Sequence, residues 1–370
     1  MRIALATLAL LLAACSTPSG PKPAALPQID QPARVRVLWS ASTGSAERFV
    51  FSPAFADGAV FTAARNGTVT RINAANGQTM WSVFAGSELS AGVGTDGRIV
   101  AVANEEGEVF ALDAQTGEKR WAARASSEVI AAPAVGSNLV LVRSIDNRLF
   151  AFGAEDGKRR WIYQRAPASL VIRVPAGVAI DGDTAYAGFA GGRLTAIALS
   201  NGGSRWEATV ALPKGATELE RVTDVVGDPV VQGREVCAAT YQGRVACYEA
   251  ASGRQVWARE ASSLTGVSLD ARYAFVSDDR GAVQAFDRSN GRSVWKQDKL
   301  AYRQLSLPVG HGEFVAVGDF EGHVHFLARE TGAFVARYST GGGAVRAAPR
   351  NLPDGILVQT QNGSLHALAP

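Results

Sequence analysis

A turn-and-tryptophan phrase recurs about every 40 residues along most of this chain, and that repeat constrains the fold more than any other feature. In six copies, a turn glycine stands four residues before a tryptophan. The pairs are Gly77 and Trp81, Gly117 and Trp121, Gly157 and Trp161, Gly202 and Trp206, Gly253 and Trp257, and Gly291 and Trp295. A period of this length is typical of supersecondary units that bury their apolar faces against one another.

Two further copies of the phrase are incomplete. The seventh keeps Gly332 but has Ala336 where a tryptophan is expected, and the eighth, at residues 362–368, ends before any turn. The remaining tryptophan, Trp39, lies at the other end of the chain with no turn phrase before it. Unpaired first and last units would leave two exposed strand edges, so we expect the segment around Trp39 to complete the last unit and close a ring.

Within one repeat the pattern predicts four short strands. Residues 100–103 and 109–112 are apolar runs joined by a turn at Gly107, and a second turn precedes the outer strand that carries Trp121. The hairpin glycine recurs, with one asparagine in its place, at Gly67, Gly107, Asn147, Gly192, Gly243, Gly281, Gly322 and Gly363. The chain is therefore predicted to be an all-β, eight-bladed β-propeller with four antiparallel strands per blade, spanning residues 35–370.

The tryptophans are interpreted as structural. Blades diverge away from the axis, and a large ring placed near the outside fills the space between neighbours. The innermost strands are expected at runs of small residues, such as 131–135, 227–231 and 347–349, because the blades crowd together near the axis.

The N-terminus is typical of an exported lipoprotein. Arg2 precedes an apolar run at residues 3–12 that is too short to span a bilayer, and the run ends at Cys15 in the form of a lipobox. We expect residues 1–14 to be a signal peptide and Cys15 to carry the lipid, which anchors the chain without spanning the membrane. Ser16 after the cysteine favours the outer membrane. The proline-rich residues 15–34 are predicted to be a flexible tether.

Charge and cysteine content exclude some classes of protein. The chain has 37 Lys and Arg against 34 Asp and Glu, which is not the balance of a nucleic-acid-binding protein. Two of its three cysteines, Cys237 and Cys247, straddle the hairpin at Gln242 symmetrically. They either form a cross-strand disulfide or fill the core as two small residues, and the sequence leaves both open.

The repeated phrase resembles the blade motif of quinoprotein, or PQQ-like, propellers over residues 35–370. Together with the lipobox, the tether and eight blades, it resembles the β-propeller lipoprotein family of the bacterial outer-membrane β-barrel assembly machinery. The resemblance implies a non-catalytic scaffold without a cofactor, which faces the periplasm from the outer membrane. It further implies binding to the POTRA domains of the central barrel subunit and a role with nascent outer-membrane proteins.

Two stretches are similar to that family's partner-binding surface. The first contains Leu170, Ile172 and Arg173, and the second contains Asp224, with Val226 where the family has another acidic residue. The tryptophan spacing widens across these stretches, so extra loop length gathers in adjacent blades, where binding residues are usually placed. The alternative is an ordinary long loop with its apolar residues turned inward.

The cysteines and histidines bear on other possible functions. A PQQ-dependent dehydrogenase would show adjacent cysteines and a set of acidic calcium ligands, whereas Cys237 and Cys247 are ten residues apart. A propeller that binds cell-wall glycan or another envelope protein stays open. Three histidines, His323, His325 and His366, recur at related positions, and we expect them at the surface and not in a metal site.

Overall fold

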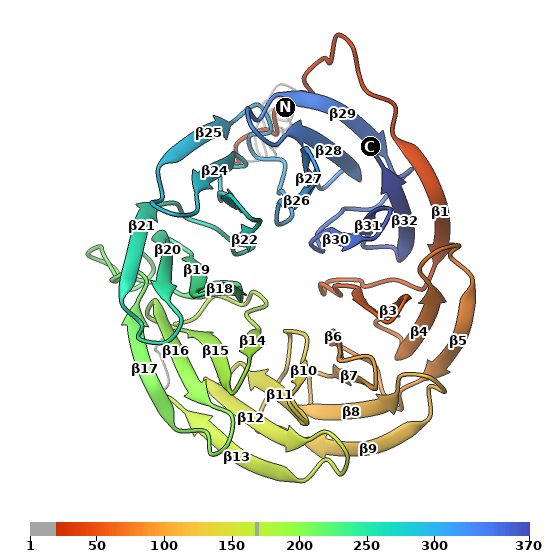
Figure 1. Cartoon of the computed structure of the whole chain (residues 1–370), viewed down its shortest axis with the longest axis vertical. Helices are drawn as coiled ribbons and strands as arrows, with labels where there is room; N and C mark the ends of the chain where they lie inside the picture. Colours follow the sequence, from red (N-terminus) through yellow and green to blue (C-terminus); the bar gives the residue numbers. More distant parts are fainter. Residues whose placement is uncertain (1–19, 167–169) are drawn as a thin grey trace, which may run out of the picture.

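The computed structural model describes residues 20–166 and 170–370. Its strands form eight four-stranded sheets arranged as blades around a central channel, as Figure 1 shows down the axis. Neighbouring strands in each sheet are antiparallel. In the first seven blades each strand is joined to the next by a hairpin or a short turn. The eight-bladed propeller predicted from the repeat is therefore confirmed.

The blades are numbered in chain order, and each runs from an inner strand to an outer strand. The first four blades contain β2 (Ala54–Ala56), β3 (Ala59–Ala63), β4 (Thr68–Asn73) and β5 (Thr79–Phe84); β6 (Ala91–Thr95), β7 (Ile99–Ala103), β8 (Glu108–Asp113) and β9 (Lys119–Arg124); β10 (Ala134–Gly136), β11 (Leu139–Ser144), β12 (Arg148–Gly153) and β13 (Arg159–Gln164); and β14 (Val178–Asp181), β15 (Thr184–Phe189), β16 (Arg193–Ala198) and β17 (Ser204–Thr209).

The last four blades follow the same plan. They contain β18 (Val225–Gln232), β19 (Glu235–Thr240), β20 (Arg244–Glu249) and β21 (Gln255–Glu260); β22 (Ser268–Leu269), β23 (Tyr273–Ser277), β24 (Val283–Asp287) and β25 (Ser293–Gln297); β26 (Val309–His311), β27 (Phe314–Gly318), β28 (His323–Ala328) and β29 (Phe334–Ser339); and β30 (Arg350–Leu352), β31 (Gly355–Gln359), β32 (Ser364–Ala369) and β1 (Arg36–Ser42).

The two chain ends close the ring. Strand β1 pairs antiparallel with β32, which places Trp39 opposite Ala367 and makes β1 the outer strand of the eighth blade. In Figure 1 these strands carry the two extreme colours of the sequence and lie side by side. The closure predicted from the isolated Trp39 is confirmed.

The hairpin glycines mostly occupy the left-handed backbone region that the turns require. Gly107 has a φ of 80° and Asn147 a φ of 62°, as expected for residues that tolerate this region. The fifth blade differs, because there the positive φ of 48° belongs to Gln242 and not to Gly243. Gly243 is still needed, since an added Cβ would lie 2.6 Å from the Cβ of Ala211.

Each tryptophan side chain packs against the blade that follows its own. The Trp121 ring lies against Gly157 of the third blade, and the Trp121 Nε1–H donates to the Ala154 carbonyl at 2.7 Å. The same donation to the next turn occurs from Trp39 to Ala74, Trp81 to Ala114, Trp161 to Leu199, Trp206 to Ala250, Trp257 to Arg288 and Trp295 to Arg329. The turn glycine and the tryptophan of the repeat are thus the two halves of one contact between blades.

This contact explains why the seventh repeat has Ala336 in place of a tryptophan. A tryptophan there would have to pack against a turn between the third and fourth strands of the eighth blade. The eighth blade has no such turn, because its third and fourth strands, β32 and β1, are the two ends of the chain. The missing tryptophan and the missing turn therefore belong to the same junction.

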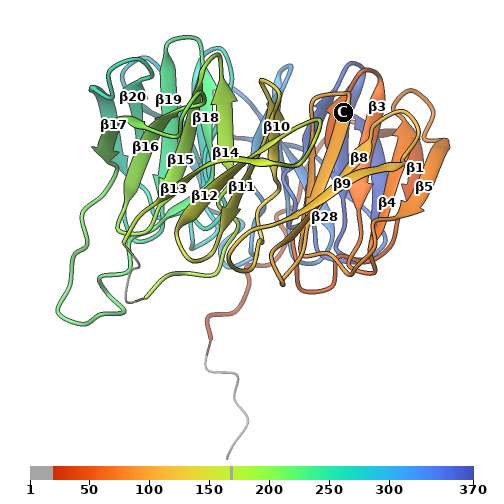
Figure 2. The ribbon, with the colours of Figure 1, turned by 90° about the horizontal axis from the view of Figure 1, so that it is seen from below.

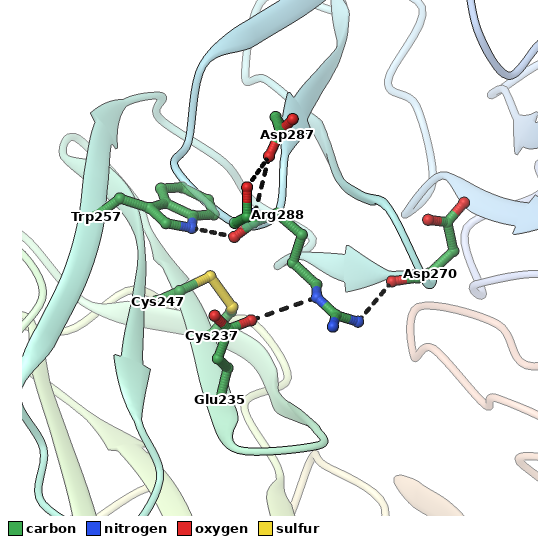
Figure 3. Close-up of a disulfide and its surroundings, with 8 residues drawn as sticks. Glu235, Cys237, Cys247, Trp257, Asp270, Asp287 and Arg288 are labelled. Atoms are coloured by element: carbon green, nitrogen blue, oxygen red, sulfur yellow. Dashed lines mark hydrogen bonds and ion pairs between the residues drawn. A yellow bond between two sulfur atoms is a disulfide. The ribbon is translucent and has the colours of Figure 1, made fainter.

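A disulfide lies near the junction of the fifth and sixth blades (Figure 3). Cys237 on β19 and Cys247 on β20 are directly opposite, with Cα atoms 4.0 Å apart and sulfurs bonded. Both side chains are completely buried, and the Trp257 side chain nearby donates to the Arg288 carbonyl of the next blade at 2.6 Å. The guanidinium of Arg288 reaches back to Glu235, with 3.3 Å between Nε and Oε2.

Two of the histidines are buried, so the expectation of surface histidines is wrong for them. His325 is inaccessible and His366 is 8% exposed. His325 Nε2 lies 3.1 Å from the carboxylate of Asp319, and Arg337 Nε donates to His325 Nδ1. Since Nδ1 accepts, the ring is neutral with its proton on Nε2. His325 is enclosed by Asp319, Arg337 and Phe334 of its own blade, and His366 lies against Tyr338 of the neighbouring blade. Tertiary packing therefore decides their burial.

The contact between each tryptophan and its turn glycine predicts that adding a Cβ to the glycine strongly lowers the free energy of unfolding. Gly157→Ala would place a Cβ 2.7 Å from the Trp121 ring, whereas Gly182→Ala, at a similar positive φ, meets nothing within 4 Å. We expect Gly182→Ala to lower the free energy of unfolding by about 1 kcal/mol and Gly157→Ala by about 2 kcal/mol more. Urea denaturation of both variants measures the difference, and equal losses would contradict the contact.

The buried histidines predict a loss of stability on acidification. Burial lowers the pKa of His325 and of His366, so the unfolded chain binds protons more tightly than the fold does. Stability should be complete above about pH 6.5 and fall below it, by at most about 1.4 kcal/mol per pH unit for each histidine.

Denaturation of the parent and of His325→Gln/His366→Gln at two pH values, about 7.5 and 5.5, measures this loss. The parent should lose more stability on acidification than the double variant, and this comparison cancels the contribution of carboxylates that do not contact either histidine. An identical pH dependence in both proteins would contradict the assignment.

Candidate partner-binding face

The predicted binding residues lie on one face of the propeller, the lower face in Figure 2. This face carries the hairpins between the second and third strands of each blade and the connections from one blade to the next. The connection from β13 to β14 contains Leu170, Ile172 and Arg173, and the long connection from β17 to β18 contains Asp224. The structure brings both stretches together, because Ile172 and Asp224 are hydrogen-bonded.

The β13–β14 connection presents an apolar tip to solvent. Leu170 and Val171 are each 45% exposed, whereas Ile172 is partly buried. Exposed neighbouring apolar side chains on a rigid scaffold are the usual anchor of a protein interface. The sequence singled out Leu170 and Ile172, and the structure adds Val171 to the exposed side.

Asp224 is buried beneath this loop and supports it through hydrogen bonds. Its side chain is only 6% exposed, and its two carboxylate oxygens accept from the backbone amides of Ile172 at 2.8 Å and of Gly191 at 3.2 Å. A buried carboxylate that accepts two amides fixes the position of both. Because Asp224 is buried in this chain, a positioning role fits it better than the predicted contact with a partner.

The residue in the second acidic position of the family pattern is also internal. Val226 lies on β18 and is 1% exposed, packed in the inner part of the fifth blade. A carboxylate at this position would be buried, which costs free energy unless it is paired. Its replacement by valine removes no exposed contact.

Arg143 is a functional candidate that the sequence prediction missed. It lies at the end of β11, donates to the Ala176 carbonyl at 3.1 Å and covers the ring of Phe189 at 5.3 Å. Its burial lowers its pKa to about 10, and the carboxylate of Asp224 opposes that shift. Arg143 and Asp224 thus bind the β13–β14 loop at two points, the Ala176 carbonyl and the Ile172 amide.

A sequence signal for Arg143 existed in the repeat itself. The equivalent positions of other blades carry small residues, among them Ala63, Ala103 and Gly318. An arginine at a position where other blades have a small side chain indicates that this blade makes a contact that the other blades do not make.

Arg173 takes part in a network of charges across the first three blades. It pairs with Glu128 and reaches Glu105 at 3.4 Å, while its own side chain is 55% exposed. Glu105 also binds Arg48 at 2.5 Å and Arg65 at 2.9 Å. Burial raises the pKa of Glu128, and Arg173 opposes that shift. The free edge of the Arg173 guanidinium is therefore presented in a fixed orientation.

Hollows adjoin the loop. A cavity of about 190 Å³ lies under it, lined in part by Arg143, Ile145 and Ile172. A larger hollow of about 570 Å³ opens beside Arg173 at the mouth of the channel, with Leu264 and Leu305 in its wall. Side chains of a partner could enter from this face without any movement of the blades.

An acidic group in the seventh blade has the spacing of a cation site. Asp319, Glu321 and His323 have ligand atoms within 4.8 Å of one another. Arg303 already pairs with both carboxylates, through Nε to Asp319 at 2.8 Å and through Nη2 to Glu321. Its guanidinium supplies the positive charge that the two carboxylates require.

Some predicted features lie outside the described residues. The signal peptide, Cys15 and the first residues of the tether fall within 1–19. Within the residues that the structure covers, no helix has the length and apolarity of a membrane span.

Comparisons with known proteins agree on one family. A family model described as "Outer membrane protein assembly factor BamB" matches residues 65–297. The chain is 44% identical to the BamB of Bordetella pertussis over 93% of this chain and 89% of that protein. It is 42% identical to the BamB of Pseudomonas aeruginosa over 98% of this chain and 97% of that protein.

Solved structures give the same fold. BamB from Moraxella catarrhalis superposes with a TM-score of 0.83 at 26% identity, covering 91% of this chain and all of that one. A quinohemoprotein alcohol dehydrogenase from Pseudomonas putida superposes with a TM-score of 0.71 at 14% identity, over 90% of this chain and 76% of that one, which shows the shared propeller fold alone.

The positioning role of Asp224 predicts a local effect. Asp224→Ala removes the acceptor for two amides, and charged acceptors contribute about 2 kcal/mol, so amide exchange at Ile172 and Gly191 should accelerate roughly 30-fold. Hydrogen exchange resolved to single residues measures this. Glu218→Ala, an exposed change in the same connection, should leave both amides unaffected, and unchanged exchange in Asp224→Ala would contradict the role.

Proposed function

Because the chain belongs to the BamB family of outer membrane protein assembly factors, we propose that it is a non-catalytic scaffold that binds the POTRA domains of the central barrel subunit. In this role it assists the folding and insertion of β-barrel proteins into the outer membrane. The observation that carries the proposal is the exposed apolar tip at Leu170 and Val171, held beside Arg173 by buried charges.

The physical form of this face suits a folded protein domain as partner. A rigid apolar tip and an arginine with a fixed orientation form a typical interface centre, since little side-chain entropy is lost on binding. The neighbouring β17–β18 connection adds the exposed side chains Leu212 and Leu219, which are 62% and 73% exposed. These residues extend the face beyond the tip.

The lipid anchor is part of the same proposal. Lipidation at Cys15 would place the propeller at the periplasmic side of the outer membrane, where POTRA domains lie. A diacyl anchor with an added acyl chain exceeds what stable membrane attachment requires. The anchor restricts the protein to a layer next to its partner and raises its effective concentration there.

The non-catalytic part of the proposal rests on residues of the channel. The channel, with a volume of about 740 Å³, is lined largely by apolar residues and by Asp228, Arg346 and Arg350. Asp228 reaches the water of the channel. Desolvation by the surrounding protein raises its pKa, and the charge of Arg350 opposes that shift. Cys237 and Cys247 are bonded across two strands and buried away from the channel.

The proposed contact predicts a specific loss of binding. Leu170→Asp would place a charge in the apolar centre of the interface, so the affinity for isolated POTRA domains should fall at least roughly 30-fold, the loss of about 2 kcal/mol typical of an interface centre. Met80→Asp is the matched control, because Met80 is similarly exposed, at 52%, on the outer strand β5.

Calorimetry with the POTRA domains, and copurification of the central subunit from membranes, measure the effect. Both variants should unfold at the parent temperature, because both side chains are exposed. Binding of Leu170→Asp at the parent affinity would remove the assignment of the face.

A further inference from the structure

The N-terminal segment before β1 lies against the seventh blade. We refer to residues 24–35 as the N-terminal strap. The Ala24 amide donates to the Ala301 carbonyl at 2.8 Å, and the Ala33 amide donates to the Val335 carbonyl of β29 at 2.9 Å. Figure 1 shows the strap leaving β1 and returning to the outside of the seventh blade. This part of the predicted flexible tether is therefore bound, which its proline content did not indicate.

Two arginines of the seventh blade region hold carbonyls of the strap. Arg303, which is 3% exposed, donates to the Ala24 carbonyl at 3.0 Å, and Arg337 donates to the Pro27 carbonyl at 2.7 Å. Proline lacks an amide hydrogen, so a proline-rich segment has fewer backbone donors than carbonyl acceptors. The arginines satisfy these acceptors with charged donors, which give the stronger type of hydrogen bond.

A buried network orients both arginines. Asp319, which is inaccessible, accepts from Arg303 Nε at 2.8 Å and from His325 Nε2 at 3.1 Å. His325 in turn accepts from Arg337 Nε at 3.3 Å. One carboxylate thus fixes, directly and through an imidazole, the two guanidinium groups that hold the strap. Burial of such a network costs free energy, and in this blade its two arginines donate to carbonyls of the strap.

The strap also covers the junction at which the tryptophan contact is missing. Val35 packs against the cluster that contains Ala336, Tyr338 and Val345, between the seventh and eighth blades. Leu26 and Ile29 of the strap are partly buried. The strap therefore supplies apolar contact where the repeat supplies neither a tryptophan nor a turn.

We propose that the Arg303, Asp319, His325 and Arg337 group is a docking site for the chain's own N-terminal strap, which seals the last blade junction and sets where the lipid anchor leaves the propeller. The second part rests on the lipidation of Cys15 proposed above. Pro21, just before the strap, lines the same hollow as Arg173. The anchor consequently leaves from the face that carries the partner-binding loop, as the course of the described segment in Figure 2 illustrates.

Docking shortens the reach of the anchor. With the strap bound, only the residues between Cys15 and Ala24 separate lipid from propeller, which is at most about 30 Å of extended chain. With the strap released, the free chain would extend to Arg36 and reach about 70 Å. Docking therefore keeps the partner-binding face turned toward the membrane and close to it.

The docking is tested on the lipidated full chain in vesicles of phosphatidylethanolamine and phosphatidylglycerol. Hydrogen exchange resolved to single residues should show Ala24 and Ala33 protected at least roughly 100-fold relative to the exposed Ala25. Arg337→Ala should reduce that protection at least roughly tenfold, while the exposed change Arg280→Ala should leave it intact. Exchange at Ala101 in the second blade should stay at the parent rate in both variants, which shows that the fold is retained.

Equal exchange of Ala24, Ala25 and Ala33 in the parent would overturn the docking site. Protection that is unchanged in Arg337→Ala would overturn the role given to the arginine network. Neither outcome depends on partner binding, so failure of this inference is distinguishable from failure of the proposed function.

The orientation is tested with one dye on either face of the second blade. Glu106→Cys lies in a lower-face hairpin and Glu118→Cys in a turn on the opposite face, and both positions are exposed. Energy transfer to a headgroup-labelled lipid should be clearly stronger from Glu106→Cys, and the difference should shrink in Arg337→Ala. Equal transfer would overturn the orientation. Loss of vesicle binding would contradict the lipidation and with it the orientation, while the exchange experiment still decides the docking.

Discussion

The contact between an indole ring and the turn glycine of the next blade is the interaction on which the rest of this propeller depends. Each tryptophan side chain reaches out of its own blade, stacks on a glycine that has no Cβ to block it, and donates to a neighbouring carbonyl. Seven such contacts join eight blades in sequence. The eighth junction lacks the contact because the chain begins and ends there, and the N-terminal strap covers it.

A scaffold joined in this way can hold a loop in one conformation. The β13–β14 loop needs such support, because its tip exposes apolar side chains that would otherwise collapse onto the surface. Asp224 at the start of the fifth blade and Arg143 of the third blade provide it, by binding the amide of Ile172 and the carbonyl of Ala176. Asp224 is buried beneath the loop, and its carboxylate opposes the lowering of the Arg143 pKa by desolvation. The candidate binding face thus depends on residues of the third and fifth blades and on the two connections that flank the fourth blade.

The same principle recurs in the seventh blade. There a buried carboxylate orients two arginines, and these bind carbonyls of the N-terminal strap. In both places charged side chains hold an irregular segment. These irregular segments, the β13–β14 loop and the N-terminal strap, distinguish this chain from a generic propeller.

The sequence by itself determined the blade count and the ring closure through Trp39, because these follow from local spacing and from which turns need glycine. It located the long loop at Leu170, but the exposure of its apolar tip came from the structure. It also showed that Cys237 and Cys247 face each other across a hairpin, without deciding between a bond and simple packing. Only the tertiary structure decided that Asp224 and His325 are buried, that Arg143 supports the loop, and that the proline-rich strap is bound. The physical reason is that these properties depend on side chains from different blades, whose distance from one another is set by the ring and not by the spacing along the chain.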